Sequence, residues 1–272
     1  MTAPRVYQTE AIILKRTKLG EADRILTFYT PELGKLKAVA KGTRRPQSKL
    51  GGHVELLTHS RLMLARGRNL DLVTQAQTIN NFLPIKDDLE RISRGLYIAE
   101  LVDSFTGEHI EDHKLFNLLL EALHQLSQGK NGELVLRYFE LNLLDHLGYR
   151  PQLQQCTGCN LPLRPEANFF SSSQGGALCY DCGYHEPMAR PLSLNALKVL
   201  RLWQSCNYTT AMRVRTNPEL AAELEQVLRE YIRYLLERQL KSTDWLDKLK
   251  RESNQSTKAP NHKFQTNTNI KI

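Results

Sequence analysis

The sequence lacks any long uninterrupted apolar segment. Nowhere do about 18 apolar residues follow one another, which is the length needed to span a membrane. Residues 1–16 reach charged and polar side chains too quickly for a secretory signal peptide, so we expect a cytoplasmic protein. These absences exclude a membrane-spanning helix and favour the reducing interior of the cell.

Motifs for nucleotide-driven or hydrolytic chemistry are also missing. The chain has no G-x-x-x-x-G-K-[ST] phosphate loop, no G-x-S-x-G nucleophile elbow and no H-E-x-x-H metal pair. Acidic pairs such as Asp87-Asp88 and Glu111-Asp112 stand at expected helix starts, where they complement the helix dipole without a catalytic role. We therefore predict that the protein is not an enzyme.

Acidic residues are scarce in the first third of the chain. Residues 1–80 contain 14 Lys or Arg against six Asp or Glu, whereas the remaining residues contain 23 of each sign, so the net charge of +8 comes from this part alone. Such concentrated positive charge is typical of a domain that binds a polyanion. The alternative is a solvated basic face that has no partner.

Five short segments rich in β-formers occupy the same region. They cover residues 9–15, 25–30, 35–41, 58–65 and 69–78, with the turn Pro31–Gly34 and the tight turn Arg66–Arg68 between successive strands. A small closed barrel such as an OB-fold accommodates five strands of this length, and an open five-stranded sheet would explain the pattern nearly as well. We assign residues 1–82 to an OB-fold-like, DNA-binding barrel.

The basic residues of this domain are the predicted DNA contacts. No acidic residue interrupts residues 33–54, and phosphate groups neutralised by such cations release condensed counterions. Strand alternation predicts Lys35 and Lys37 on one face, and at most one of Phe28 and Tyr29 could stack on a base. The predicted DNA-binding residues are Lys35, Lys37, Lys41, Arg44, Arg45, Lys49, Arg66 and Arg68.

From Pro84 onward the apolar spacing becomes helical. Helices are expected over residues 85–105, 115–126, 134–147, 194–203 and 218–240, with Asn217 as an N-cap before Pro218. We predict an α-helical domain over 83–240 that forms one bundle and is interrupted by a module at 151–190. The polar residues 241–272 are predicted to be a mostly disordered tail. The fold class is therefore α+β.

Four of the five cysteines form two C-x-x-C pairs separated by 19 residues: Cys156, Cys159, Cys179 and Cys182. Four thiolates form the closed tetrahedral site that structural Zn²⁺ prefers, and Gly158 and Gly183 are expected to supply backbone freedom to the two knuckles. An iron–sulfur centre, a redox pair or cysteines without a shared ligand are the alternatives. His185 could also replace one of the cysteines.

Several stretches of the chain resemble the RecO family. They are residues 10–15, 19–25, 30–35 and 39–45 near the start, then residues 138–144 with Leu147-Gly148-Tyr149 and Pro151 before the cysteines. The resemblance spans roughly residues 5–240, and it implies a DNA repair and recombination mediator with structural zinc. RecO-like proteins bind single- and double-stranded DNA, anneal complementary strands, work with RecR and RecF, and help RecA displace single-strand-binding protein by docking onto its acidic C-terminal tail.

Two other classes of function were considered against the residue pattern. A zinc-ribbon transcription factor or ribosome-associated factor would read a particular nucleic acid through the same basic and cysteine-rich features. A metal-dependent hydrolase or nuclease would need an open coordination position and acidic ligands, neither of which is apparent. Sequence selectivity of binding would distinguish the first alternative from a repair mediator.

Overall fold

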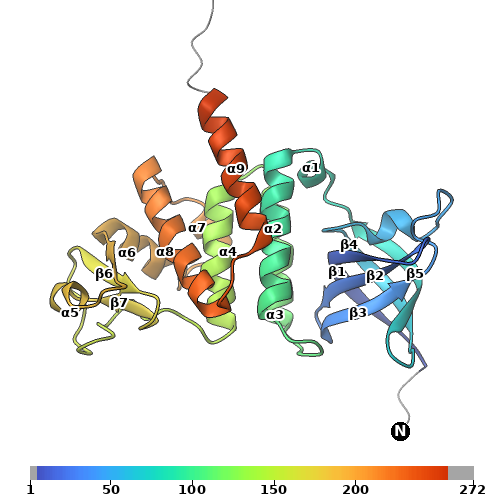
Figure 1. Cartoon of the computed structure of the whole chain (residues 1–272), viewed down its shortest axis with the longest axis horizontal. Helices are drawn as coiled ribbons and strands as arrows, with labels where there is room; N and C mark the ends of the chain where they lie inside the picture. The colour runs from blue at the N-terminus through green and yellow to red at the C-terminus, as the bar shows by residue number, and fades with distance from the viewer. Residues whose placement is uncertain (1–4, 257–272) are drawn as a thin grey trace, which may run out of the picture.

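The computed structural model describes residues 5–256, with side chains described through residue 251. The chain forms a β-barrel at one end, a helical domain in the middle and a small sheet with the short helix α5 (Tyr180–Tyr184) at the other end (Figure 1). The α+β class predicted from the sequence is confirmed. No helix within residues 5–256 has both the length and the apolar character that crossing a bilayer requires.

Five strands close into a barrel in the order β1-β2-β3-β5-β4. All neighbours pair antiparallel except β3 and β5, whose short parallel pairing closes the barrel. The strands are β1 (Val6–Leu19), β2 (Asp23–Thr30), β3 (Gly34–Ala40), β4 (His59–Ala65) and β5 (Asp71–Asn80), with a short 3₁₀-helix at Gly51–Val54. A five-stranded barrel of this kind is the one predicted from the sequence.

The barrel is packed on both of its faces where it meets the helices. Phe28 points into the barrel core with Leu26, whereas its neighbour Tyr29 joins Ile12 in the core of the helical domain. Because successive strand residues point to opposite faces, this is the burial expected for a sheet covered on both sides. At most one of Phe28 and Tyr29 was expected to be able to stack on a base; both are fully buried, so neither is available for stacking.

The helical domain uses the start signals that the sequence carries. Asp88, Asp112 and Asn217 each accept a hydrogen bond from a backbone N–H of the first helical turn, at 2.9 Å. The helices are α1 (Leu83–Lys86), α2 (Leu89–Phe105), α3 (His113–Ser127), α4 (Gly132–His146), α5 (Tyr180–Tyr184), α6 (Leu194–Trp203), α7 (Tyr208–Ala211), α8 (Pro218–Leu236) and α9 (Lys241–Ser256).

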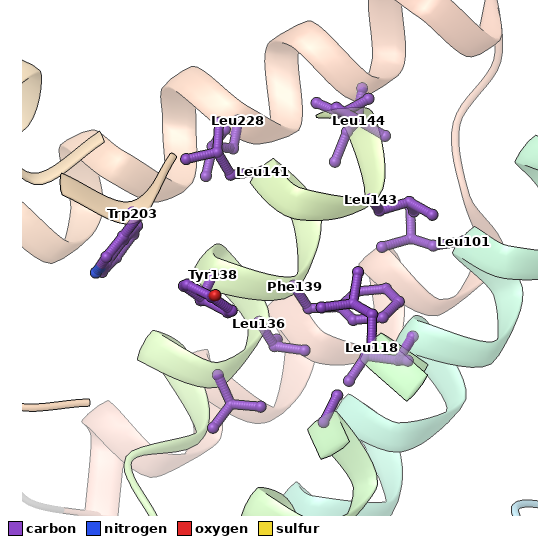
Figure 2. Packing of buried hydrophobic residues seen from close by; sticks show 14 of the residues in the cluster. Leu101, Leu118, Leu136, Tyr138, Phe139, Leu141, Leu143, Leu144, Trp203 and Leu228 are labelled. Atoms are coloured by element: carbon purple, nitrogen blue, oxygen red, sulfur yellow. The ribbon is translucent and has the colours of Figure 1, made fainter. Parts of the chain in front are cut away.

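Helix α4 lies at the centre of this domain, with buried side chains on most of its circumference. Phe139 and Leu143 pack toward α2 and α3, while Leu141 faces Leu228 of α8 (Figure 2). Burying a side chain of this size contributes about 1.5–3 kcal/mol relative to exposing it. Helices from both sides of the cysteine segment therefore share one core, as predicted.

The polar C-terminal segment corrects one prediction. Residues 241–256 form helix α9, which packs along α2, so they are not the disordered tail that their composition predicted; residues 257–272 lie outside the described residues. The helix buries Leu246 and starts against the Glu100 carboxylate, which accepts hydrogen bonds from the backbone N–H groups of Lys241 and Ser242. Tertiary contacts thus offset the low apolar content of the segment.

Candidate nucleic-acid interface and metal centre

The loop of residues 41–50, between β3 and the 3₁₀-helix, presents four exposed cations: Lys41, Arg44, Arg45 and Lys49. None of the four makes an ion pair within residues 5–251, whose side chains are described, so their charges are available to a ligand. The loop is fixed at its base, where the backbone N–H of Gly42 donates to the Asp23 carboxylate at 2.8 Å. Gly42 adopts a φ of 66°, a left-handed conformation that glycine allows at little cost.

Three further cations lie at the same end of the barrel: Arg16, Lys18 and Arg24. Lys18 and Arg24 are directly opposed across β1 and β2, and Arg24 is opposed to Ala40, the residue before Lys41. Burial and the nearby Arg24 charge lower the pKa of Arg16, whose Nε has no hydrogen-bond partner in the described part of the chain. We call these three and the four loop cations the rim patch.

Two of the predicted DNA contacts, Lys35 and Lys37, pair with carboxylates of the helical domain. Lys35 shares a face of β3 with Lys37, as strand alternation predicts, but it is covered there: the residue is 7% exposed, and its Nζ contacts the Asp103 carbonyl oxygen at 2.6 Å and the Asp103 carboxylate at 3.3 Å. Lys37 is half exposed and pairs with Glu108 after α2. The barrel strand that was expected to face DNA is therefore partly covered by the helical domain.

Arg66 and Arg68 occupy a separate exposed turn between β4 and β5. The guanidinium of Arg66 lies 5.0 Å above the centre of the Tyr7 ring, within the range of a cation–π contact. Turns after the first and fourth strands flank the binding face of OB-folds, so Arg66 and Arg68 stay predicted contacts at the edge of that face.

The four cysteines Cys156, Cys159, Cys179 and Cys182 come together as predicted. Their sulfur atoms all lie within 4.8 Å of one another, and the Sγ atoms of Cys159 and Cys179 are 3.9 Å apart. A tetrahedral zinc ion with Zn–S bonds of about 2.3 Å separates its sulfurs by about 3.8 Å. The donor set and its spacing could hold one metal ion and fit zinc, and His185 is not part of the cluster.

Backbone geometry prepares the cluster for a cation. Burial of Cys156 opposes its ionisation, but backbone N–H hydrogen bonds, led by that of Cys179 at 3.3 Å, outweigh it and lower the pKa of Cys156 to about 6. A hydrogen bond with Cys179 and burial raise the pKa of Cys182 to about 12. One thiolate thus forms readily and further ones are resisted until a positive ion compensates them.

The two knuckle glycines are needed for their small size and not for backbone freedom. Neither Gly158 nor Gly183 has a positive φ; the left-handed residue of the first knuckle is Asn160, with φ 62°. A Cβ on Gly158 would lie 3.0 Å from the Cys182 sulfur, and one on Gly183 would lie 2.4 Å from the Phe169 ring. The glycines are therefore needed because the chain, the sulfurs and an aromatic ring approach one another closely.

The module also contains a three-stranded sheet that was not predicted: β6 (Asn168–Ser171), β7 (Gly176–Leu178) and β8 (Arg190–Leu192). Its apolar residues join the helical core instead of forming one of their own, and Phe170 meets Tyr231 of α8 edge to face at 5.5 Å. The Nε of Arg201 on α6 also donates to the Leu153 carbonyl at 2.8 Å. The module therefore packs against α6 and α8 and supports them.

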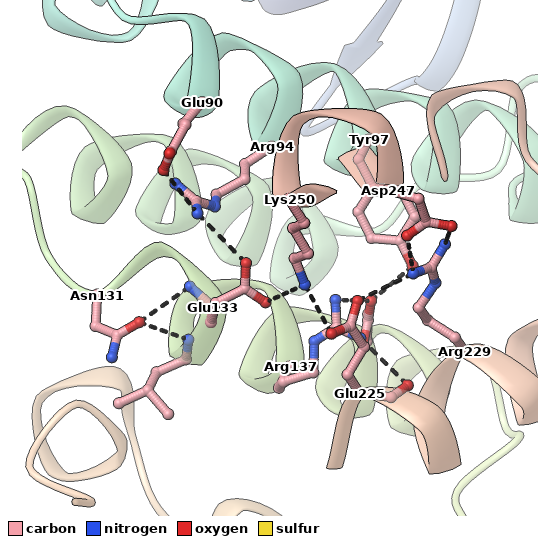
Figure 3. A network of polar contacts seen from close by, with 12 residues as sticks. Glu90, Arg94, Tyr97, Asn131, Glu133, Arg137, Glu225, Arg229, Asp247 and Lys250 are labelled. Atoms are coloured by element: carbon pink, nitrogen blue, oxygen red, sulfur yellow. Dashed lines mark hydrogen bonds and ion pairs between the residues drawn. The ribbon is translucent and has the colours of Figure 1, made fainter. Parts of the chain in front are cut away.

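A buried polar network lies inside the helical domain, where α2, α4, α8 and α9 meet (Figure 3). Tyr97 donates to the Glu140 carboxylate at 2.6 Å, and Arg137 pairs with the same carboxylate at 3.0 Å. An adjoining groove of about 440 Å³ is lined by four cations and four carboxylates: Arg229, Arg233, Arg238, Lys250, Glu225, Glu230, Asp244 and Asp247. Because the two signs balance, the charge of the groove does not favour an anionic ligand. The charged side chains of the network and of the groove therefore link the helices of this domain to one another.

Comparison with known proteins gives matches along nearly the whole chain. The family described as "Recombination protein O N terminal" matches residues 1–82, and "Recombination protein O C terminal" matches residues 86–244. The "DNA repair protein RecO" of Roseiflexus sp. (strain RS-1) is 47% identical over 89% of this chain and 86% of that protein. Proteins with the same description from Dehalococcoides mccartyi (strain BAV1) and Symbiobacterium thermophilum are 42% and 35% identical, covering 92% and 90% of this chain and 98% of each relative.

Proposed function

The chain belongs to the RecO family of DNA repair and recombination proteins, and from this premise we propose that it is a non-enzymatic recombination mediator. It binds single- and double-stranded DNA, anneals complementary strands and, with RecR and RecF, helps RecA load onto DNA coated by single-strand-binding protein. It acts in the cytoplasm, on the nucleoid. Single-strand-binding protein is engaged through its acidic C-terminal tail.

The rim patch is the observation that carries this proposal. Seven cations lie at one end of a small barrel, and none of them makes an ion pair within the described residues. Cations of this kind favour a phosphate backbone over particular bases, because Lys and Arg contacts to phosphate carry no sequence information. Binding of many DNA sequences with similar affinity is what an annealing protein requires.

The cysteine cluster supports zinc as a structural cofactor. Cys156, Cys159, Cys179 and Cys182 would hold the ion, which supplies cross-linking of two knuckles and no open position for a reacting ligand. Its contribution is to fold the module against α6 and α8. Zinc therefore has a structural role in this proposal and does not contact DNA.

Two experiments test the function. The first measures fluorescence anisotropy of several unrelated single- and double-stranded oligonucleotides; similar affinities are expected, whereas preference for one sequence would favour a transcription or ribosome-associated factor.

The second captures single-strand-binding protein with and without its last few residues on the purified protein. Retention of the intact form alone is expected, and equal capture of both forms would contradict the mediator role.

A further inference from the structure

Lys15, Thr27 and Lys37 form one row across β1, β2 and β3. Thr27 is the register partner of Lys15 on one side and of Lys37 on the other, so the three side chains share a face of the barrel. Strands 2 and 3 form the face through which OB-folds bind oligonucleotides. The row therefore places two cations where a phosphate backbone is expected to pass.

Carboxylates of the helical domain already form ion pairs with these two lysines. Glu108, in the connection between α2 and α3, pairs with Lys37, and Asp103 at the end of α2 lies 3.7 Å from the Lys15 ammonium. The mutual hydrogen bond raises the pKa of Lys37 and lowers the pKa of Glu108. Each carboxylate thus supplies to its lysine the negative charge that a DNA phosphate would otherwise supply.

The backbone keeps Glu108 in place while leaving its side chain exchangeable. Glu108 forms a parallel bridge with Lys35, and the N–H of His109 donates to the Lys35 carbonyl at 3.0 Å. The side chains of Lys37 and Glu108 nevertheless remain 44% and 42% exposed. Water and ions reach such a pair, so the Lys37 ammonium is accessible to a competing anion.

We propose that Glu108 is an intramolecular competitor of the DNA phosphate for Lys37, which weakens DNA binding and confines it to the rim patch. This inference rests on the proposed DNA-binding function. DNA that extends from the rim patch along strands β2 and β3 must replace the Glu108 carboxylate before it gains the Lys37 contact. The contact between the two domains thereby sets the length of DNA engaged.

The test compares Glu108→Gln with Glu111→Gln. Both changes remove one exposed negative charge from the same connection, but Glu111 pairs with His113 and not with a barrel lysine. Anisotropy with a fluorescent 20-nucleotide oligothymidine should give about two- to fivefold tighter binding for Glu108→Gln than for Glu111→Gln, the range expected for releasing an exposed ion pair. Its salt dependence should steepen by about 0.7 on the log–log scale, the value for one added phosphate contact.

Lys37→Ala identifies the source of the gain. The substitution should reduce affinity little in the wild-type background and should abolish the gain in the Glu108→Gln background. Equal binding by Glu108→Gln and Glu111→Gln, or a gain that persists without Lys37, would overturn the inference while leaving the rim patch and the DNA-binding function untouched. Absence of binding by the wild-type protein would remove both. Thermal unfolding of every variant shows whether the fold is retained.

Discussion

Trp245 of α9 donates a hydrogen bond from its indole Nε1 to the hydroxyl oxygen of Ser93 on α2, at 2.8 Å, although 152 positions separate the two residues. Arg229 of α8 holds the same helix through a two-pronged contact with Asp247, at 2.6 and 3.0 Å (Figure 3). The polar C-terminal helix is therefore anchored at several points and belongs to the folded domain.

Leu246→Ala tests whether α9 contributes to the stability of the whole domain. Leu246 is 8% exposed and packs in the helical core, so its truncation should lower the free energy of unfolding by about 2 kcal/mol, the lower end for a buried leucine. Arg251→Ala, at an exposed position on the same helix, should change it by no more than about 0.5 kcal/mol. Urea unfolding measures both, and equal effects would show that α9 is not docked.

The buried Glu140 predicts a pH dependence. Burial raises the pKa of Glu140 to about 7, although the Arg137 charge and the hydrogen bond from Tyr97 act in the opposite direction. Since the unfolded chain has a carboxyl pKa of about 4.3, the folded state binds the extra proton between these values, and this contribution to stability is lost as the pH rises from about 4 to about 7.

Glu140→Gln should remove that dependence. Its stability relative to the wild type should improve as the pH increases from 5 to 8, measured by urea unfolding at each pH. Glu166→Gln removes the same charge from an exposed loop and is the control for the loss of one carboxylate. A stability difference between Glu140→Gln and the wild type that does not vary from pH 5 to 8 would contradict the raised pKa.

Metal content tests the cysteine cluster. Replacing Cys156, Cys159, Cys179 or Cys182 by Ser should reduce bound zinc from about one equivalent toward zero, because a closed tetrahedral site needs four thiolates. Cys206→Ser is the matched control, since Cys206 is the fifth cysteine and lies outside the cluster. Elemental analysis of the purified variants measures the zinc bound per chain. Zinc retained by all the cluster variants would exclude this site.

Removal of zinc should act locally. The module has no core of its own and packs on α6 and α8, so chelation should increase hydrogen exchange over residues 151–192 and leave the barrel strands protected. Uptake of zinc should also weaken as the pH falls, because protons compete with the ion for the thiolates. Exchange that increases throughout the chain would indicate that the barrel depends on the metal as well.

Regular periodicity explains which elements were predictable. Segments rich in β-formers and the turns between them located β1 to β5, and apolar residues at helical spacing located the long helices, because these signals are local. Strands β6 to β8 have only three or four residues each, too few for alternation to appear. Helix α9 is stabilised mainly by tertiary contacts, which composition does not contain.

The same distinction applies to the site. The C-x-x-C spacing predicted the cysteine cluster because each pair is held by its own short turn. Burial of Lys35 depends on Asp103, which lies 68 positions further along the chain, and no local pattern indicates that contact. Lys18 and Arg24 were missed because their opposition depends on the register of the β1–β2 hairpin.

In the proposed function, the loop of the rim patch binds the DNA backbone. The decisive measurement is the salt dependence of oligonucleotide affinity for a protein in which all four loop cations are replaced by Ala: Lys41, Arg44, Arg45 and Lys49. Its control replaces four exposed cations of the helical domain that make no ion pair within the described residues: Lys130, Lys198, Arg213 and Arg215. We expect the loop variant alone to lose affinity at low salt and about 3 units of log–log slope. Equal losses in the two variants, or an unchanged slope in the loop variant, would contradict the account.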